Sequence, residues 1–335
     1  MNRKVKKILF VIAVFGLFIY LFQTTDLANA KDPDYPTKPI TLLIGFSAGG
    51  PGDLTTRAFV EPAAKYLGQS FVPEYKTGAA GSIALMAVMN AKPDGYTLGM
   101  VLPSSIFVAP FSGDAEYKDL TGLTMIANFG AGVYPLMVKS DAPWKTWKEF
   151  IEWAKKNPRA AKMGIAGAKS VVSTGIMLWQ VEKREQVEFT CVPFKASNEI
   201  LTAVLGGHIT VFCGGADATN MQYVNEGKLR ILTYLGTVKA SGYENISSMP
   251  ELYGFEIPNV QGIVGPKGLP DYVLEKLADA FAKAIKNPDF INVLKRFYTP
   301  VVYMDRAQMT KYVDENFRKF GEIMKAMKAE EEAKK

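Results

Sequence analysis

The 335-residue chain has few of the side chains on which most catalytic and metal centres depend. It contains a single histidine, His208, and two cysteines, Cys191 and Cys213. Histidine is the commonest general base and metal ligand, and these three residues lack the spacing of a metal-binding cluster. We therefore expect no metal site, no cofactor and no enzyme activity.

An excess of one charge is also lacking. Lysine and arginine number 39, aspartate and glutamate number 33, and the formal net charge is +6. No basic face with interleaved aromatic residues accompanies this small excess. The glycines form neither a G-x-x-x-x-G-K-[ST] loop nor a G-x-G-x-x-G turn between a strand and a helix. The sequence therefore predicts neither a nucleic acid nor a nucleotide as a partner.

Long apolar runs are missing except near the N-terminus. Residues 8–22 are apolar, four basic residues precede them, and Ala28-Asn29-Ala30 has the small-x-small pattern of a cleavage site. This arrangement is typical of a secretory signal peptide, and we expect cleavage after Ala30. The alternative is an uncleaved anchor, although the run is shorter than the ~20 residues that span a bilayer. Without residues 1–30 the chain keeps 35 basic and 32 acidic residues, a net charge of +3.

What the chain does have is a strand–turn–helix unit that occurs twice. Residues 40–59 read ITLLIGFSAGGPGDLTTRAF, an apolar strand, a Gly/Ser turn and a polar helix start, and residues 162–179 read KMGIAGAKSVVSTGIMLW. The first N–H groups of a helix have no intrahelical acceptor, and the helix dipole adds positive potential there. Two such turns in two halves of one chain predict a cleft that holds an anion from both sides.

Helices alternate with apolar strands along the whole chain. The clearest helix is 146–157, where Thr146 and Glu149 match a capping box and an apolar stripe follows, formed by Trp147, Phe150, Ile151 and Ala154. The alternation predicts an α/β fold with doubly wound, mostly parallel sheets. In such sheets ligands bind beyond the carboxyl ends of the strands, which is where both Gly/Ser turns lie.

The same topology bears on the two cysteines. Cys191 and Cys213 each end a predicted strand, and the strand of residues 162–166 lies between those two. Sulfurs two strand spacings apart, about 10 Å, cannot form a disulfide. We therefore expect two free, buried thiols.

Small, uncharged hydrogen-bond donors recur at the predicted carboxyl ends of strands. Any one of them could be an ordinary turn residue, but their recurrence at one edge favours a shared binding site. The candidates are Ser47, Gly49, Gly50, Gly81, Ser82, Ser104, Ser105, Ser170, Ser173, Thr174, Gly214 and Gly215.

One enzymatic alternative stays open at this point. Gly45-Phe46-Ser47-Ala48-Gly49 matches the G-x-S-x-G nucleophile elbow of serine esterases, between a strand and a helix. The sole histidine, His208, lies in a turn before a strand, at the sheet edge opposite the ligand turns. No earlier strand is available to carry an oxyanion loop. Ester turnover that disappears in Ser47→Ala would establish this alternative.

Taken together, the segments of the chain resemble a known family. The markers are YPTKPITLLIGFSAGGPGD, YKTGAAGSIA, KPDGYTLGMV, SDAPWKTWKEFIEWAKKNP, MGIAGAKS, VPFKASNEILTAVLGGHITV, EGKLRILTYLG and GIVGPKGLP. From Tyr35 to about Met324 the sequence resembles the substrate-binding proteins of tripartite tricarboxylate transporters, the Bug-type receptors.

The resemblance implies a two-lobed periplasmic binding protein of type II topology with a two-segment hinge. Lobe 1 would comprise residues 35–132 plus 256–335 and lobe 2 residues 133–255, after the signal peptide of residues 1–30. Such a receptor captures a small organic carboxylate in the periplasm and delivers it to the small and large membrane permease subunits. We expect a monomer without catalytic activity. The alternative within this resemblance is a ligand sensor for a membrane signalling protein.

The resemblance also implies which residues contact the ligand. The first lobe would contribute one turn with two neighbouring segments, and the second lobe the turn of MGIAGAKS. Residues carried over are Ser47, Ala48, Gly49, Gly50, Gly81, Ser82, Ser104, Ser105, Ser170, Ser173 and Thr174. The chain departs from the family pattern at Lys169, where glycine is common, and at Cys213-Gly214-Gly215, where an Asp-containing stretch is usual. Asp217 could compensate for the missing aspartate of that stretch. Gly214 and Asp217 complete the candidate ligand-binding set.

Overall fold

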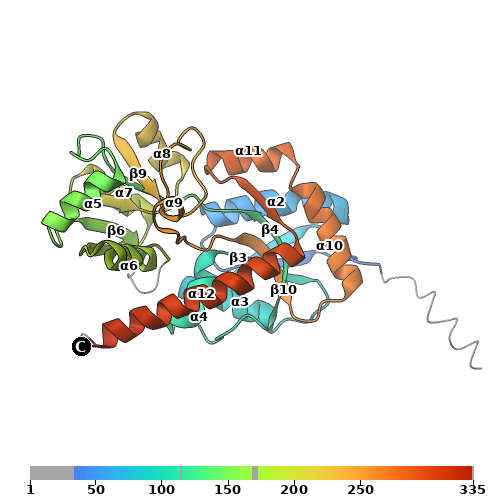
Figure 1. The fold of residues 1–335 in the computed structure, drawn as a ribbon. Helices are drawn as coiled ribbons and strands as arrows, with labels where there is room; N and C mark the ends of the chain where they lie inside the picture. Colours follow the sequence, from blue (N-terminus) through green and yellow to red (C-terminus); the bar gives the residue numbers. More distant parts are fainter. Residues whose placement is uncertain (1–33, 114, 168–172, 334–335) are drawn as a thin grey trace, which may run out of the picture. The chain divides into compact units, whose positions relative to one another are not determined.

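The computed structural model describes residues 34–113, 115–167 and 173–333, and Figure 1 shows their fold. Residues 36–335 fall in one compact unit, to which the following description applies. The predicted signal peptide, Lys169 and Ser170 lie outside the described residues. Within these ranges, no helix combines the length and the apolar character that crossing a membrane requires.

The first lobe is built on a six-stranded sheet with the strand order β11-β4-β10-β3-β1-β2. Its strands are β1 (Ile40–Ile44), β2 (Phe71–Tyr75), β3 (Thr97–Val101), β4 (Leu123–Gly130), β10 (Gln261–Pro266) and β11 (Val301–Met304). Its helices are α2 (Pro51–Leu67), η1 (Ala79–Gly81), α3 (Ser82–Met89), η2 (Ser104–Val108), α4 (Ala109–Ser112), α10 (Asp271–Ala284), α11 (Pro288–Arg296) and α12 (Arg306–Ala333).

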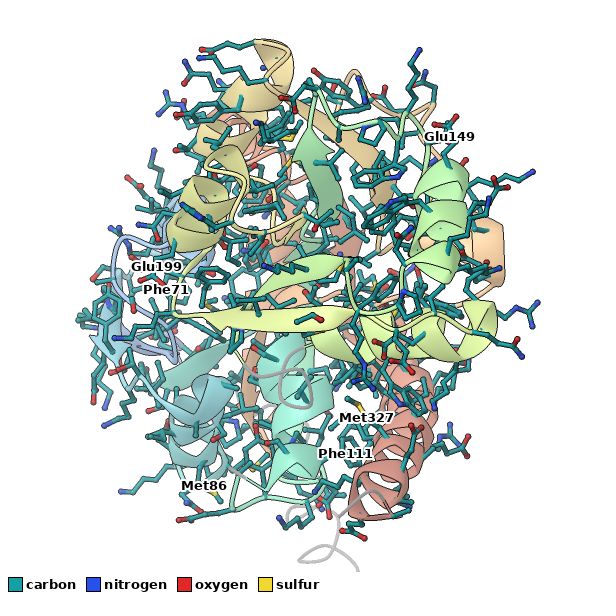
Figure 2. All side chains as sticks on the ribbon, turned by 90° about the vertical axis from the view of Figure 1, so that its left-hand side faces the viewer. Phe71, Met86, Phe111, Glu149, Glu199 and Met327 are labelled. Atoms are coloured by element: carbon teal, nitrogen blue, oxygen red, sulfur yellow. The ribbon has the colours of Figure 1, made fainter. Side chains whose placement is uncertain are left out.

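The second lobe is built on a five-stranded sheet with the order β7-β6-β8-β5-β9. Its strands are β5 (Pro135–Lys139), β6 (Lys162–Ala166), β7 (Thr190–Phe194), β8 (Val211–Cys213) and β9 (Leu229–Tyr234). Its helices are α5 (Trp147–Lys156), α6 (Ser173–Glu185), α7 (Ser197–Leu205), α8 (Ala218–Asn225) and α9 (Met249–Tyr253). Glu149 on α5 and Glu199 on α7 are exposed and point outward in Figure 2.

The predicted α/β class and two-lobed architecture are confirmed, but the sheets are mixed rather than mostly parallel. β1 pairs in parallel with β2 and β3, as β6 does with β7 and β8. β10 runs antiparallel to β3 and β4, and β5 runs antiparallel to β8 and β9. The reason is the double crossing of the chain. β4 carries the chain out of the first sheet and β10 brings it back, so these neighbours run in opposite directions.

The core fixes the orientation of α2, the helix that follows the first Gly/Ser turn. Phe59 on α2 is fully buried, and its ring lies 4.5 Å from that of Phe129 on β4 and 5.3 Å from that of Phe290 on α11. Aromatic pairs at such distances add to the stabilisation that comes from burial. The start of α2 is therefore held by the same packing that joins the sheet to its helices.

The two cysteines lie on β7 and β8, with β6 between them as predicted. Cys191 is in register with Met163 of β6, and Cys213 with Ile165. Cys213 is a buried thiol, and burial raises the pKa of that thiol well above its ordinary value. Cys191 is half-buried rather than buried, because β7 is the edge strand of its sheet.

Gly45, at the end of β1, allows two backbone segments to approach closely. A Cβ added at Gly45 would lie 2.8 Å from both the Cα and the carbonyl oxygen of Gly81. Backbone atoms cannot move aside as a flexible side chain can. We expect Gly45→Ala to lower the free energy of unfolding by about 1–3 kcal/mol, as measured by urea denaturation. Gly236→Ala is the control, because the nearest atom to its added Cβ is 4.0 Å away. Equal stability of the two variants would contradict the close approach.

Candidate functional site

A cleft of about 310 Å³ lies where the connections of the two sheets meet. The first lobe contributes the start of α2, the residues after β3, and the residues before β10 and β11. The second lobe contributes the starts of α7 and α8, and the segment between β4 and β5 completes the wall. The lining residues are Pro51, Gly52, Thr55, Leu102, Pro103, Gly132, Val133, Tyr134, Ser197, Gly215, Ala216, Asp217, Asn259, Val260, Gln261 and Thr299.

The start of α2 presents backbone N–H groups to this cleft. Gly50 is the N-cap residue, and no described side chain caps the helix there. Pro51 has no N–H, so Gly52 carries the first helical N–H that lacks an intrahelical acceptor. An added Cβ at Gly52 would lie 2.8 Å from Cε of Met100 and 3.2 Å from Cδ1 of Leu102. Glycine at this position lets the helix start pack closely against the cleft wall.

A buried carboxylate organises the loop before α2. The Asp53 side chain has no exposed surface, and its Oδ2 accepts a 2.7 Å hydrogen bond from the N–H of Gly49. Its Oδ1 accepts from Nε of Arg57 at 3.0 Å and from the hydroxyl of Tyr75 at 3.1 Å. Asp53 thus closes the turn back onto the helix.

The predicted turn Ser47-Ala48-Gly49-Gly50 is placed beside the cleft by this loop. Ser47, Ala48 and Gly49 are exposed, and none of the four lines the cleft as the structure describes it. The N–H of Gly49 is bonded to Asp53, and the N–H of Gly50 to the carbonyl of Ser47 at 3.2 Å. The N–H groups of Gly49 and Gly50 are therefore engaged within the loop itself, whereas Pro51 and Gly52 in the first turn of the helix line the cleft.

In the second lobe, α7 is the helix whose start faces the cleft without a side-chain cap. Its N-cap residue is Ala196, in an extended conformation, and Ser197 at the first helical position lines the cleft. The sequence predicts a helix here, but its contribution to the cleft was not recognised, because SNEIL reads as an ordinary helix start. The signal available in the sequence is Ala196, which has no side chain able to cap the helix that follows.

The start of α8 differs because it is capped by its own side chains. The Asp217 carboxylate accepts from the N–H of Asn220 at 2.8 Å, and the Asn220 side chain accepts from the N–H of Asp217 at 3.1 Å. Asn220 also donates to the carbonyl of Gly215 at 2.9 Å. Asp217 lines the cleft, but at least one of its oxygens is committed to this capping box. The neighbouring candidate, Gly214, is buried. The lining begins at the next residue, Gly215.

The two segments that connect the lobes are bonded to each other at the cleft. The side-chain amide of Asn259 accepts from the N–H of Gly132 at 2.9 Å and donates to its carbonyl at 2.6 Å. The N–H of Asn259 donates to the Tyr312 hydroxyl at 2.9 Å, which ties the return segment to α12. On the side of the second lobe, the N–H of Ala216 donates to the carbonyl of Val133 in the outgoing segment at 2.7 Å.

A buried polar network supports the first-lobe wall. The Gln261 amide donates to the hydroxyl of Thr55, and the N–H of Gln261 donates to Oδ1 of Asn128 at 2.8 Å. Asn128 in turn donates to the carbonyl of Val302 at 2.7 Å. The cleft side chains of Thr55 and Gln261 are thereby held in place from β4, β10 and β11. Asn259 and Gln261 were also missed in the sequence, because residues with strand-like neighbours gave no sign of facing a ligand.

The cleft has little side-chain charge among its described lining residues. Among the described lining residues there is no lysine or arginine, and Asp217 is the one charged side chain. Tyr134 adds a hydroxyl, and burial raises its pKa to about 12, so the phenol stays protonated at physiological pH. Any anion held here must be bound by backbone N–H groups and neutral side-chain donors.

The remaining first-lobe candidates are not among the described lining residues of the cleft. Gly81 and Ser82 are buried at the start of α3, where Gly81 adopts a φ of +88°. The Ser105 hydroxyl donates to the carbonyl of Leu102 at 2.9 Å, and that of Ser104 to the carbonyl of Ala80 at 3.4 Å. Leu102 and Pro103, immediately before them, line the cleft.

In the second lobe, Ser173 and Thr174 form the half-buried start of α6, and they are not among the described lining residues. Ser170 lies outside the described residues. His208 is exposed before β8, whereas the cleft residues follow that strand. Ser47 is exposed on the first lobe. Nor do any three His, Cys, Asp or Glu residues in the described ranges cluster as a metal site would need.

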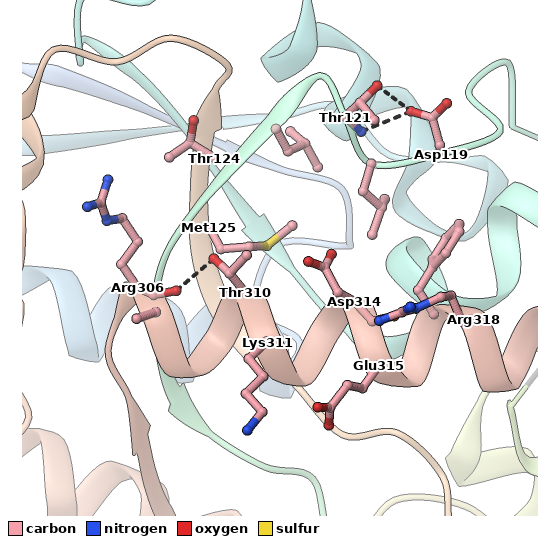
Figure 3. Close-up of a pocket in the computed structure, with 14 residues that line it drawn as sticks. Asp119, Thr121, Thr124, Met125, Arg306, Thr310, Lys311, Asp314, Glu315 and Arg318 are labelled. Carbon is pink, nitrogen blue, oxygen red and sulfur yellow. Dashed lines mark hydrogen bonds between the residues drawn. The ribbon is translucent and has the colours of Figure 1, made fainter.

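A larger groove of about 950 Å³ lies on the first lobe alone, between α12 and the start of β4 (Figure 3). Its polar groups are partly engaged with their own elements. Asp119 accepts from the N–H of Thr121 at 2.9 Å, and the Thr310 hydroxyl donates to the carbonyl of Arg306 at 2.7 Å. None of the candidate residues from the sequence lines this groove. The smaller cleft between the lobes is therefore the candidate functional site.

Comparison with known proteins identifies relatives over most of the chain. Residues 55–329 match the family model described as the tripartite tricarboxylate transporter family receptor. A Cupriavidus necator protein described as the UPF0065 protein in the gbd 5′ region is 31% identical over 294 residues, covering 87% of this chain and 88% of that one.

Solved structures show the same fold. A TctC solute-binding protein from Polaromonas has a TM-score of 0.75 and 25% identity, covering 87% of this chain and 99% of its own. MatC from Rhodopseudomonas palustris with bound malate has a TM-score of 0.70 and 22% identity, covering 87% of this chain and 100% of its own.

The role given to Asp53 can be tested by removing its carboxylate. Asp53→Ala leaves the N–H of Gly49 and the Tyr75 hydroxyl without their acceptor, so we expect the free energy of unfolding to fall by about 2–3 kcal/mol in urea denaturation. Arg57→Gln is the matched control, because the Arg57 side chain is 44% exposed and should contribute less than about 1 kcal/mol. If both variants lost the same small amount, Asp53 would not be the organising group.

Proposed function

The chain belongs to the tripartite tricarboxylate transporter receptor family, and we propose that it is a periplasmic receptor that captures a small organic carboxylate between its lobes. The family and the two-lobed fold support a solute receptor. The chemistry of the cleft supports an anionic group on the solute. Malate bound to MatC, a protein of the same fold, is consistent with a ligand of this class.

The observation that carries the proposal is the pairing of two helix starts from different lobes. Gly52 at the start of α2 and Ser197 at the start of α7 both line the cleft, and neither helix has a side-chain cap among the described residues. Unpaired N–H groups and the positive ends of two helix dipoles then face one space. A carboxylate has two oxygens, and each lobe would serve one of them.

The energies are adequate without a cationic side chain. A hydrogen bond to a charged group contributes roughly 1.5–3 kcal/mol, and a favourable helix end up to about 2 kcal/mol. With Tyr134 and Gln261 as further neutral polar groups in the lining, the gross interaction can exceed the cost of association. A net value near −8 kcal/mol corresponds to micromolar binding.

The lobe boundaries and the closing motion are part of the proposal. The first sheet takes its strands from residues 40–130 and 261–304 and the second from 135–234. This supports lobe 1 at residues 35–132 plus 256–335 and lobe 2 at residues 133–255, with the Asn259–Gly132 pair at the hinge. A ligand that touches both lobes favours the arrangement in which both line the cleft.

The setting in the cell is proposed on the same grounds. We propose that the signal peptide is removed after Ala30, that the mature protein is a monomer, and that it delivers its ligand to the small and large permease subunits. We also propose that it has no catalytic activity. A serine esterase needs its histidine beside the nucleophilic serine. Ser47 lies on the first lobe and His208 before β8 of the second, which supports the absence of such a pair.

Thermal melting of residues 31–335 with a panel of organic carboxylates, amino acids and sugars tests the function. Ligands that bind only the native state raise the melting temperature. A rise of several degrees with one subset of carboxylates is the expected result. A rise with sugars alone would contradict a carboxylate receptor.

Replacing Ser197 tests the second helix start. Proline is tolerated at the first helical position, and the extended Ala196 suits a residue before proline, so Ser197→Pro removes one N–H while the helix is kept. We expect at least tenfold weaker binding of the best carboxylate from the panel, by calorimetric titration. Ser197→Ala, which keeps the N–H, is the control and should bind at least threefold more tightly than the proline variant. Equal affinities of the two would remove this N–H from the site.

The raised pKa of Tyr134 predicts a pH dependence. The phenol should remain a hydrogen-bond donor as the pH rises through 10, the ordinary value, and ionise only near 12. Subtracting the ultraviolet tyrosinate titration of Tyr134→Phe from that of the unaltered protein isolates this group. Carboxylate affinity should show no loss attributable to Tyr134 between pH 7 and about pH 10. A difference titration centred at 10 would contradict the burial argument.

A further inference from the structure

Helix α12 belongs to the first lobe but ends against the second. It follows β11, and its buried stripe of Met309, Val313, Phe320 and Met324 packs in the first-lobe core. Its last turns lie alongside α6, the helix that follows β6 of the second lobe (Figure 1, Figure 2). This contact is separate from the two hinge segments and from the cleft lining.

The contact combines an ion pair with a shared hydrogen bond. Nζ of Lys183 on α6 lies 2.6 Å from Oε2 of Glu330 on α12. The indole N–H of Trp179, one turn earlier on α6, donates to the same oxygen at 3.2 Å. The Lys183 ammonium also lies 5.8 Å from the centre of the Trp179 ring. One carboxylate of the first lobe thus receives two donors from the second.

Beneath these polar groups the contact is apolar. Ile176 of α6 is fully buried and belongs to the same cluster as Met309 and Met327 of α12. Trp179 packs against that cluster. Moving α6 away from α12 would expose Ile176 and Met327 to water, which is unfavourable in proportion to the apolar area uncovered.

We propose that this α6–α12 contact is a strap that stabilises the arrangement in which both lobes line the cleft. Any motion that carries α6 away from the first lobe must break the Glu330 bonds and uncover Ile176. The strap therefore sets the population of the ligand-competent arrangement in the free protein. Its effect on affinity rests on the proposed receptor function, because apparent affinity falls with the fraction of competent molecules.

The chain offers a matched control on the same helix. Lys155 on α5 and Glu185 on α6 form a 2.7 Å ion pair inside the second lobe, with side chains 45% and 22% exposed. The Lys183 and Glu330 side chains are 50% and 25% exposed. The two pairs are alike in length and exposure, and they differ in whether they join the lobes.

The test measures the distance between the lobes without ligand. Spin labels at Glu61→Cys on α2 and Thr219→Cys on α8, both exposed positions, are placed in a Cys191→Ala, Cys213→Ala background. The distance distribution is then compared for Glu330→Lys, for Lys183→Glu, for the double swap, and for the control Glu185→Lys. Circular dichroism establishes that each variant is folded.

We expect either single reversal to increase, about two- to fivefold, the fraction of molecules whose lobe distance differs from that of the unaltered protein, since exposed ion pairs have effects of this size. The double swap should restore the original distribution, and Glu185→Lys should leave it unchanged. An unchanged distribution in Glu330→Lys and Lys183→Glu, or the same change in Glu185→Lys, would overturn the strap.

A second measurement links the strap to ligand capture, with malate as the probe. Calorimetric affinity should fall in each single reversal by about the factor by which the competent population falls, and recover in the swap. If the unaltered protein does not bind malate, the receptor proposal loses support for this ligand while the distance experiment still tests the strap. Malate affinity that is unchanged despite altered distances would separate the strap from capture and contradict its proposed effect.

Discussion

The double crossing of the chain between two sheets is the constraint from which the rest of the structure follows. Because one segment leaves the first lobe and another returns, β4 and β10 must lie antiparallel, as must β5 and β9. The two crossing segments are bonded through Asn259 and Gly132, and the cleft lies directly beside them. A solute bound in this cleft, as proposed, would contact residues of both lobes beside the segments that join them.

The second physical theme is that the proposed anion site has no cationic side chain among its described lining residues. Acidic residues near the cleft are used for the protein's own backbone: Asp53 closes the loop before α2, and Asp217 caps α8. The helix starts that these carboxylates do not cap, at Gly52 and Ser197, remain open toward the cleft. Backbone donors held by packing need no reorganisation when a ligand binds. They can donate to the carboxylate of any ligand, whatever the rest of that ligand is. In the proposed site, selectivity among carboxylates would depend on the rest of the lining, including Tyr134, Gln261 and Thr299.

The sequence was sufficient for the fold class, the two lobes and individual local elements. The helix predicted from Thr146 and its apolar stripe is α5, and Trp147, Phe150, Ile151 and Ala154 are all buried. The Thr146 hydroxyl accepts from the N–H of Glu149 as a capping residue should, whereas the Glu149 carboxylate accepts from the N–H of Lys145 instead of completing the box. Local patterns of this kind depend only on residues close together in the chain, so the helix could be predicted from the sequence.

The details of the site depend on contacts that local patterns do not encode. Gly132 meets Asn259, 127 residues away, and Gln261 reaches Thr55 across 206 residues. One donor expected in the first turn, the N–H of Gly49, is bonded to the buried carboxylate of Asp53. In the sequence, Asp53 looks like a common helix-start residue. The antiparallel crossing strands were not foreseen either, because direction is decided by topology and both directions give the same apolar pattern.

The central claim is that two helix starts, one from each lobe, share one carboxylate. The most direct measurement is amide nuclear magnetic resonance of ¹⁵N-labelled residues 31–335, titrated with the best carboxylate from the melting panel and with its neutral amide. The account predicts that the Gly52 and Ser197 N–H signals shift together with the carboxylate, at one common affinity, and do not shift with the amide. Shifts of equal size with the amide, or shifts confined to one helix start, would contradict it.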